Sequence, residues 1–343
     1  MSFAFRFLGT GTSQGVPIIG KEYPEAFLAN PRNHRLRASI YIETPAVRLV
    51  IDTTPDFRTQ MLREKLGYLD AVLITHEHSD HCIGLAALLR QNPALKVFAN
   101  RETARRIQGA LKVKPDWQLF ETGTTFEFRG LQITSIPIPH DAADPVGYAI
   151  DCPAEDARPT KRVTWLTDLG HATDVVKHHC ALADILVLEA NYDDEMLDLS
   201  KRPLHLKQRI RGNHGHLSNH AARDLLLGLR EWQTSELFLG HLSKECNRTI
   251  LVDEVMNAVR QHKADVRVTV AYPPDVDTPG YARESADKPP ECAAISEGSP
   301  LYGADAVARC IAQGMARNCF VAPNPSPVLG LLQALCRGVV PPS

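Results

Sequence analysis

The sequence reads Thr75-His76-Glu77-His78-Ser79-Asp80-His81 immediately after an apolar run. Imidazole nitrogen and carboxylate oxygen are ligands that zinc, manganese and iron accept, and a set without cysteine can leave a position for water. A loop this short cannot wrap all four groups round a single ion. The spacing therefore predicts two metal sites, with His76 and His78 facing one and Asp80 and His81 facing the other. A polar loop with solvated histidines is the alternative, and the density of ligand-type side chains argues against it.

Three downstream residues are candidates for the remaining ligands. Each follows an apolar run and is expected at the end of a strand: His140 in Ile138-Pro139-His140, Asp168 in Leu166-Thr167-Asp168, and His241 in Leu239-Gly240-His241. Taken singly, such a histidine is more often a capped loop residue than a ligand. Together and in this order, the three residues complete a set of ligands for two metals.

Short strand-like runs recur over the first 265 residues, with turn residues between them, and helical patterns are fewer. We expect strands at residues 39–42, 48–51, 71–74, 96–98, 131–136, 146–150, 162–166 and 185–188, after a first strand at the N-terminus. We expect helices at residues 57–65, 83–90, 102–111, 220–232 and 251–262. Interleaved strands with covering helices predict an α/β fold in which helices sandwich sheets.

The order of these residues resembles the metal site of the metallo-β-lactamase-fold hydrolases. The resemblance implies an α/β fold, the αββα sandwich, over residues 1–263, with two divalent metal ions, zinc as the first choice and manganese as the second. It implies the metal ligands His76, His78, Asp80, His81, His140, Asp168 and His241. It also implies that Asp168 bridges the metals, that Asp80 and Asp168 are catalytic, and that Asp52 supports the site.

Residues 8–17, 189–192 and 215–219 are similar to the phosphoribosyl 1,2-cyclic phosphate phosphodiesterases and the YycJ-type phosphodiesterases. In related RNA-processing members a histidine acts near the leaving group, and the resemblance implies this catalytic role for His216, with His214 as a weaker candidate. The alternative is a capping loop, in which Ser218 or Asn219 caps the next helix and His216 is merely exposed. The branch commonly has a cysteine cluster after the opening glycine motif. Residues 20–34 contain no cysteine, so we expect no structural zinc there.

Two cations about 3.5–4 Å apart can generate hydroxide from a shared water and neutralise charge on a phosphodiester. A protonated imidazole can donate to the departing oxygen, and we assign this step to His216. The expected function is hydrolysis of a phosphodiester by a metal-bound hydroxide, with a cyclic ribose phosphate, a cyclic nucleotide or a nucleic-acid end as substrate. A thioester or other ester hydrolase on the same fold stays open. A basic cluster could contact a polyanion or form a solvated loop: Lys201, Arg202, Lys207, Arg209 and Arg211.

The last part of the chain differs from the rest, because all fourteen histidines lie at or before His262. Residues 264–343 look like the C-terminal portion of 3-ketodihydrosphingosine reductase, a short-chain dehydrogenase, above all around residues 269–280. Because no glycine-rich turn or Tyr-x-x-x-Lys pair precedes this segment, we expect a remnant without the cofactor-binding fold, with a helix at 304–316. The alternative for this segment is an unrelated Pro-rich extension. For the whole protein, the alternative functions are a sphingolipid-pathway oxidoreductase and a binding module without catalysis.

Composition excludes several function classes. The 343 residues include 38 Lys plus Arg and 40 Asp plus Glu, so no global field draws the chain to nucleic acid or to an anionic membrane. The eight cysteines are scattered, which indicates reduced thiols in a cytoplasmic protein. We expect no signal peptide and no membrane span, because no apolar run approaches about 18 residues. A homodimer stays open as an assembly.

Overall fold

Several strands in the first half of the chain are continuous apolar runs, and their successive side chains enter two different cores. In β3 (Arg48–Ile51), Leu49 and Ile51 enter one buried cluster while Val50 enters another. Successive side chains of a strand point to opposite faces, so a strand that is apolar throughout is covered on both faces. The sheet that contains β3 is therefore an inner layer of the fold.

The computed structural model describes residues 3–29, 33–153 and 160–271. A first sheet has the strand order β1-β2-β3-β4-β5-β6. Its strands are β1 (Ala4–Gly9), β2 (Ser39–Glu43), β3, β4 (Ala71–Leu73), β5 (Lys96–Asn100) and β6 (Asp116–Phe120). The strands from β3 to β6 run parallel.

A second sheet has the order β13-β12-β11-β10-β9-β8-β7. Its strands are β7 (Thr125–Phe128), β8 (Leu131–Pro137), β9 (Val146–Cys152), β10 (Lys161–Leu166), β11 (Ile185–Glu189), β12 (Glu236–Gly240) and β13 (Arg267–Val270). The strands from β10 to β13 run parallel. In β10, Val163 and Trp165 join the cluster that also holds Leu49 and Ile51, so this cluster is the core between the two sheets.

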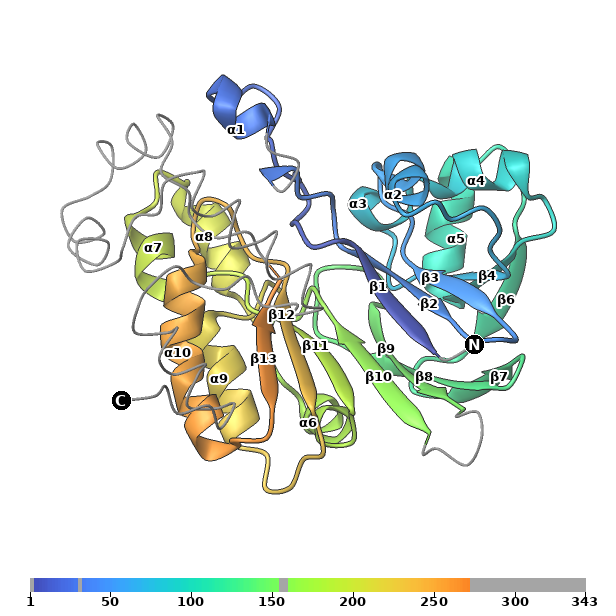
Figure 1. The fold of residues 1–343 in the computed structure, drawn as a ribbon. Helices are drawn as coiled ribbons and strands as arrows, with labels where there is room; N and C mark the ends of the chain where they lie inside the picture. Colours follow the sequence, from blue (N-terminus) through green and yellow to red (C-terminus); the bar gives the residue numbers. More distant parts are fainter. Residues whose placement is uncertain (1–2, 30–32, 154–159, 272–343) are drawn as a thin grey trace, which may run out of the picture. The chain divides into compact units, whose positions relative to one another are not determined.

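Helices cover the outer faces of both sheets (Figure 1). The first sheet has α2 (Phe57–Arg63), α3 (Ser79–Cys82), α4 (Leu85–Gln91) and α5 (Arg101–Ala110), and the second has α6 (Asp174–Ala181), α9 (Asn219–Leu227) and α10 (Thr249–His262). Two short helices follow β11, namely α7 (Asp194–Leu199) and α8 (Leu204–Arg211). The layers are those of an αββα sandwich, which confirms the predicted fold class.

The predicted strands and long helices match the observed elements, with differences at their ends. The helix expected over 220–232 is α9, which ends at Leu227, before the Gly228 cap. The helix expected over 83–90 is α4, and the last residues of the motif from Thr75 to His81 lie in the single turn of α3. None of the helices in the described part of the chain is long and apolar enough to cross a membrane.

The domain boundary that we expect after residue 263 falls just before β13. This strand pairs in parallel with β12, and one compact unit comprises residues 1–19 and 34–272. The short helix α1 (Glu25–Ala29) belongs to a second unit, in which the Tyr23 and Phe27 rings stack with centroids 4.8 Å apart. The predicted reductase-like remnant and its helix at 304–316 lie almost wholly outside the described residues and stay predictions.

Candidate metal centre

The candidate site lies at the carboxyl ends of the parallel strands in both sheets, the edge at which open α/β sheets bind ligands. Asp52 directly follows β3 and is fully buried. Its Oδ1 accepts a hydrogen bond from the Thr75 backbone N–H at 2.9 Å, and its Oδ2 accepts from the Thr75 hydroxyl at 2.9 Å and from His81 Nδ1 at 2.8 Å. Asp52 therefore fixes both ends of the loop from Thr75 to His81.

These contacts determine which nitrogen of each imidazole faces the site. The single hydroxyl proton of Thr75 goes to Asp52, so Thr75 Oγ1 accepts from His76 Nδ1 at 2.9 Å. His81 donates through Nδ1 to Asp52, and His140 donates through Nδ1 to the Gly215 carbonyl at 3.1 Å. In each ring Nε2 is then the nitrogen left to face the site. This second layer of hydrogen bonds is what metal-ligating histidines almost always have.

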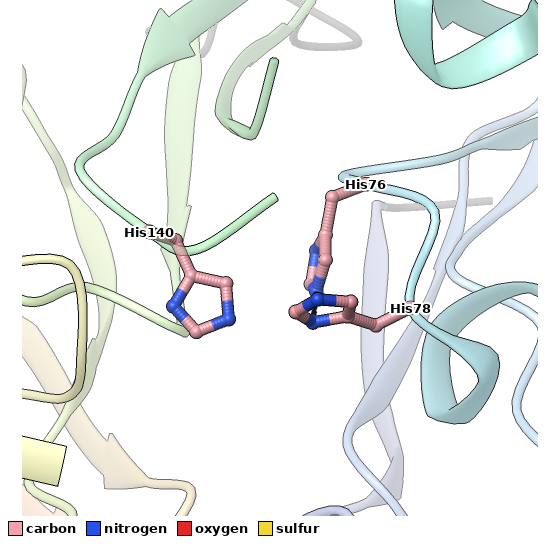
Figure 2. A group of neighbouring side chains, drawn as sticks. All are labelled: His76, His78 and His140. Carbon is pink, nitrogen blue, oxygen red and sulfur yellow. Dashed lines mark hydrogen bonds between the residues drawn. The ribbon is translucent and has the colours of Figure 1, made fainter. Parts of the chain in front are cut away.

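His76, His78 and His140 form one group of nitrogen donors (Figure 2). His76 Nε2 and His78 Nδ1 face each other 3.0 Å apart, and one ligand atom from each of the three residues lies within 4.8 Å of the other two. His76 and His78 precede α3, whereas His140 comes from the connection between β8 and β9. The first predicted pair thus acquires a third donor from the other sheet.

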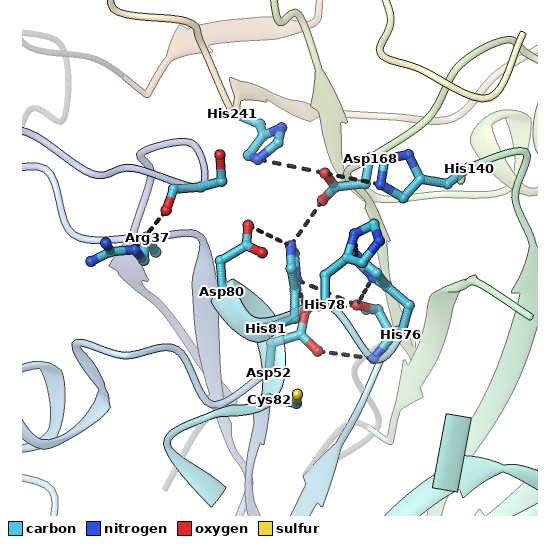
Figure 3. A network of polar contacts seen from close by, with 12 residues as sticks. Arg37, Asp52, His76, His78, Asp80, His81, Cys82, His140, Asp168 and His241 are labelled. Carbon is cyan, nitrogen blue, oxygen red and sulfur yellow. Dashed lines mark hydrogen bonds and ion pairs between the residues drawn. The ribbon is translucent and has the colours of Figure 1, made fainter. Parts of the chain in front are cut away.

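Asp168 lies between this group and a second one (Figure 3). Its Oδ2 is 3.2 Å from His81 Nε2, and its Oδ1 is 3.7 Å from His241 Nε2 and 3.8 Å from His140 Nε2. Asp80 Oδ2 lies 3.4 Å from His81 Nε2. The second predicted pair, Asp80 and His81, is therefore together, and Asp168 adjoins histidines of both groups.

Three residues of the site have a left-handed backbone that non-glycine residues rarely adopt. The φ angles are 64° at Asp52, 58° at Asp168 and 59° at His241. Each residue stands just after the end of a strand, and such strain costs on the order of 1–3 kcal/mol per residue. Nearby bonds hold it in place, since the Asn191 side chain donates to the His241 carbonyl at 2.8 Å and Ser39 Oγ donates to the Asp52 carbonyl at 3.0 Å.

The charges of the site are strongly coupled. Burial raises the pKa of Asp168, but the charges of His241, His81 and His140 outweigh burial and hold that pKa well below its usual range. Burial lowers the pKa of His241, but the Asp168 and Glu189 charges raise it to about 9. For His76, burial and the charge of His81 both lower the pKa, which falls well below its usual value. The carboxylates thus favour positive charge at the centre, while His76 stays neutral, the form in which an imidazole can bind a metal.

Glu189 is the residue of this site that the motif reasoning missed as a functional group. It ends β11 and is fully buried. Its Oε1 accepts from His216 Nδ1 and from His241 Nδ1, both at 2.8 Å, and its Oε2 accepts from the Leu169 backbone N–H at 2.7 Å. The available signal was a carboxylate at the end of an otherwise apolar strand.

His216 lies at the centre rather than in a solvated loop. Its Nδ1 is 3.8 Å from Asp168 Oδ1, and its side chain is 23% exposed. Ser218 also caps α9, because its hydroxyl accepts from the Ala221 N–H at 3.2 Å. The capping contact and the placement of His216 at the site therefore occur together. His214 is exposed.

Comparisons with known proteins identify the family of the chain. Residues 47–242 match the family model described as the β-lactamase superfamily domain. The chain is 34% identical over 256 residues to exodeoxyribonuclease WalJ of Streptococcus pneumoniae serotype 2, covering 70% of this chain and 92% of that protein. It is 29% identical over 233 residues to exodeoxyribonuclease YycJ of Bacillus anthracis, covering 65% of this chain and 85% of that protein.

A solved structure of a diphosphatase from the PhnP family shares the fold. The TM-score is 0.57 at 22% identity, covering 79% of this chain and 95% of that one. The resemblance to a reductase is partial: 3-ketodihydrosphingosine reductase of Bos taurus is 30% identical over 115 residues, which are 34% of this chain and 31% of that protein. A match to about a third of a reductase gives little support to an oxidoreductase as the whole-chain function.

Proposed function

The chain belongs to the β-lactamase superfamily and is a metal-dependent hydrolase, and from this premise we propose that it cleaves phosphodiesters at nucleic-acid ends with two bound metals. The observation that supports two metals is the position of Asp168, whose carboxylate oxygens lie 3.2–3.8 Å from Nε2 of His81, His140 and His241. The nucleic-acid substrate is supported by the two exodeoxyribonucleases that align over most of their length.

The donors present fit two divalent cations. Four imidazoles turn Nε2 inward because Nδ1 is bonded elsewhere, and Asp168 Oδ2 is a buried oxygen without a hydrogen bond in the described part of the chain. One metal would be held by His76, His78 and His140, the other by Asp80, His81 and His241, with Asp168 shared. This nitrogen-rich set suits zinc first and manganese second. When bound, the two cations would activate water and neutralise charge on the phosphate.

The protein's own groups would orient the ligands and move the proton. Asp52 fixes the ring of His81, the Gly215 carbonyl fixes His140, and Glu189 fixes His241. Glu189 also holds Nδ1 of His216, which leaves Nε2 to donate a proton to the departing oxygen. This assignment makes His216 the general acid and Glu189 the residue that positions it.

The test is turnover by metal-stripped full-length protein that is resupplied with zinc or manganese. We expect metal to restore hydrolysis of an activated aryl phosphodiester and shortening of a labelled DNA strand from one end. Asp80→Ala is expected to lose metal and activity together, whereas Asp174→Ala, at an exposed carboxylate on α6, is expected to keep both. Unchanged metal content and turnover in Asp80→Ala would contradict the two-metal proposal. Turnover of a thioester without turnover of either phosphodiester would contradict the substrate.

A further inference from the structure

The structure gives different partners to the basic residues that precede His216. Arg202 pairs with Glu245 at 2.9 Å, Lys207 Nζ donates to the Asp198 carbonyl at 2.6 Å, and Arg211 pairs with the Asp198 carboxylate at 2.8 Å. Lys207 and Arg211 are thus turned back toward α7. Arg209 differs from them, because its Nε donates at 2.5 Å to Oδ2 of Asp141, the residue that follows His140.

This ion pair lies beside the metal centre. Asp141 Oδ1 is 3.3 Å from His140 Nε2, the nitrogen that faces His76 and His78. The loop that holds Asp141 is itself fixed, since the Ala143 N–H donates to Glu77 Oε1 at 3.0 Å and Asn100 Nδ2 donates to the Asp144 carbonyl at 2.6 Å. The Arg209 guanidinium is therefore held one carboxylate away from a proposed metal ligand.

The end of α8 that holds Arg209 also positions the proposed general acid. The His216 backbone N–H donates to the Ile210 carbonyl at 2.8 Å. Gly215 packs so closely here that a Cβ would lie 2.2 Å from the Arg209 carbonyl oxygen. The backbone of Arg209 consequently lies next to the segment that carries the proposed general acid.

The guanidinium is available for a second partner. The Arg209 side chain is 61% exposed, and only Nε has a hydrogen bond assigned to it within the described residues. The remaining N–H groups form the planar fork that binds phosphate with two parallel hydrogen bonds. Asp141 orients this fork. Because the Asp141 carboxylate is paired with Arg209, it does not present an unpaired negative charge to an incoming phosphate.

We propose that Arg209 binds the phosphate next to the scissile one, on the leaving-group side of a nucleic-acid strand. This inference rests on the proposed function and makes it more specific. A diester with a single phosphate would place that phosphate at the metals and leave no anion for Arg209. A strand supplies a second phosphate, so Arg209 favours strands over small diesters.

The test compares Arg209→Gln with Arg211→Gln, a matched control on the same helix whose carboxylate partner is Asp198 of α7. The probe is a fluorescent single-stranded DNA with phosphorothioate linkages, bound to the zinc-loaded full-length protein and followed by anisotropy over a salt series. We expect Arg209→Gln to weaken binding about 10- to 100-fold. The slope of log affinity against log salt should fall by about 0.7, the value for one phosphate contact to a single strand.

Arg211→Gln is expected to change affinity less than twofold, and Arg209→Lys to recover only part of the loss because it keeps the charge without the fork. The ratio of kcat/KM for a DNA strand to that for an aryl phosphodiester should fall about 10- to 100-fold in Arg209→Gln. Equal losses on both substrates would overturn the proposal and make Arg209 a positioning residue for His140. Equal effects of Arg209→Gln and Arg211→Gln on binding would overturn it, because both residues would then act only through the overall positive charge of the surface. If the wild type cleaves neither substrate, the proposed function fails, while the binding comparison still decides the role of Arg209.

Discussion

His216 combines two features that the sequence offered as alternatives, a position before a helix cap and a place at the centre. Its Nδ1 is bound by Glu189, so the ring can present only Nε2 to a substrate. A proton delivered from a positioned imidazole contributes roughly 100- to 10,000-fold to a rate. The size of that contribution depends on the leaving group, which makes the role measurable.

We expect His216→Ala to slow cleavage of an ester with a poor leaving group by about 100-fold or more and to spare an activated aryl ester. An aryl oxide departs without a proton, so only the first substrate needs the acid. The measurement is kcat on both substrates, with His171→Ala as a control because His171 is an exposed imidazole of a neighbouring loop, bonded to the Asn213 carbonyl. Equal losses on the two substrates would make His216 a ligand or a scaffold residue.

Glu189 and His241 form a buried ion pair whose contribution to stability depends on pH. Burial raises the pKa of Glu189, but the His216 and His241 charges lower it from 4.5 to about 2, so its contribution is complete above pH 4.5 and lost as pH falls toward 2. The pKa of His241 is raised from 6.5 to about 9, so its contribution is complete below pH 6.5 and lost as pH rises through 9. The pair therefore stabilises the metal-free fold most between these two unfolded values.

Glu189→Gln is expected to lower the free energy of unfolding of the metal-free protein by about 1.5–3 kcal/mol near pH 5.5. This is the size expected for the loss of a hydrogen bond to a charged group. The difference between wild type and variant should shrink toward pH 2 and above pH 9. Urea denaturation across this range with a chelator measures it. A difference that stays constant from pH 2 to pH 10 would show that the Glu189 charge is not what stabilises the fold.

Among the elements, the buried strands and the long helices were predictable, whereas the sequence did not indicate the strands β6, β7 and β13 or the short helices α7 and α8. The apolar run Leu49-Val50-Ile51 follows from the two cores that flank β3, so the strand is visible in the sequence as a short continuous apolar segment. The helix α8 has a single buried residue, Ile210, and its other side chains are exposed or partly exposed. A helix with so little apolar face gives no periodic signal, which is why the position of Arg209 could not be predicted.

The end of α2 offers a prediction about the helix alone. Lys65 has φ 54° and follows the helix cap, the position at which helices usually have glycine. The Leu66 N–H donates to the Met61 carbonyl at 2.9 Å, a contact that requires this left-handed residue. The exposed Lys65 side chain has no packing to compensate the backbone cost.

We expect Lys65→Gly to raise the free energy of unfolding by about 0.5–1 kcal/mol, since the left-handed cost of about 1–2 kcal/mol exceeds the entropic cost of glycine. Lys65→Ala removes the same charge but keeps the strained backbone and is expected to give no gain. Denaturation midpoints of the three proteins test this expectation. An equal gain from alanine and glycine would attribute the effect to charge instead of to backbone conformation.

At the scale of the whole molecule, the centre is built by two sheets that the sequence presents far apart. The first sheet supplies Asp52 and the loop from Thr75 to His81, and the second supplies His140, Asp168 and His241. The order of the residues predicted the members of the set. It could not predict that His140 joins His76 and His78, because that contact depends on how the sheets pack. Glu189 was missed for the related reason that a carboxylate at the end of an apolar strand does not by itself show which imidazoles it contacts.

A centre shared by two sheets links metal binding to the stability of both. Ligands bound only to the native state stabilise it, by about 2.7 kcal/mol per site at a free concentration 100 times the dissociation constant. We therefore expect zinc to raise the free energy of unfolding of the stripped protein by roughly this amount for each site. Magnesium, which prefers oxygen ligands, is the control and is expected to have little effect.

The more specific expectation concerns hydrogen exchange: zinc should slow exchange at the carboxyl ends of β4 and of β10 together, since His76 follows one strand and Asp168 the other. In Asp168→Asn, which retains a side chain that tolerates the left-handed backbone, the joint slowing should be lost. Protection confined to one sheet in the wild type would mean that the metals do not join the two layers, and the shared role of Asp168 would have to be abandoned.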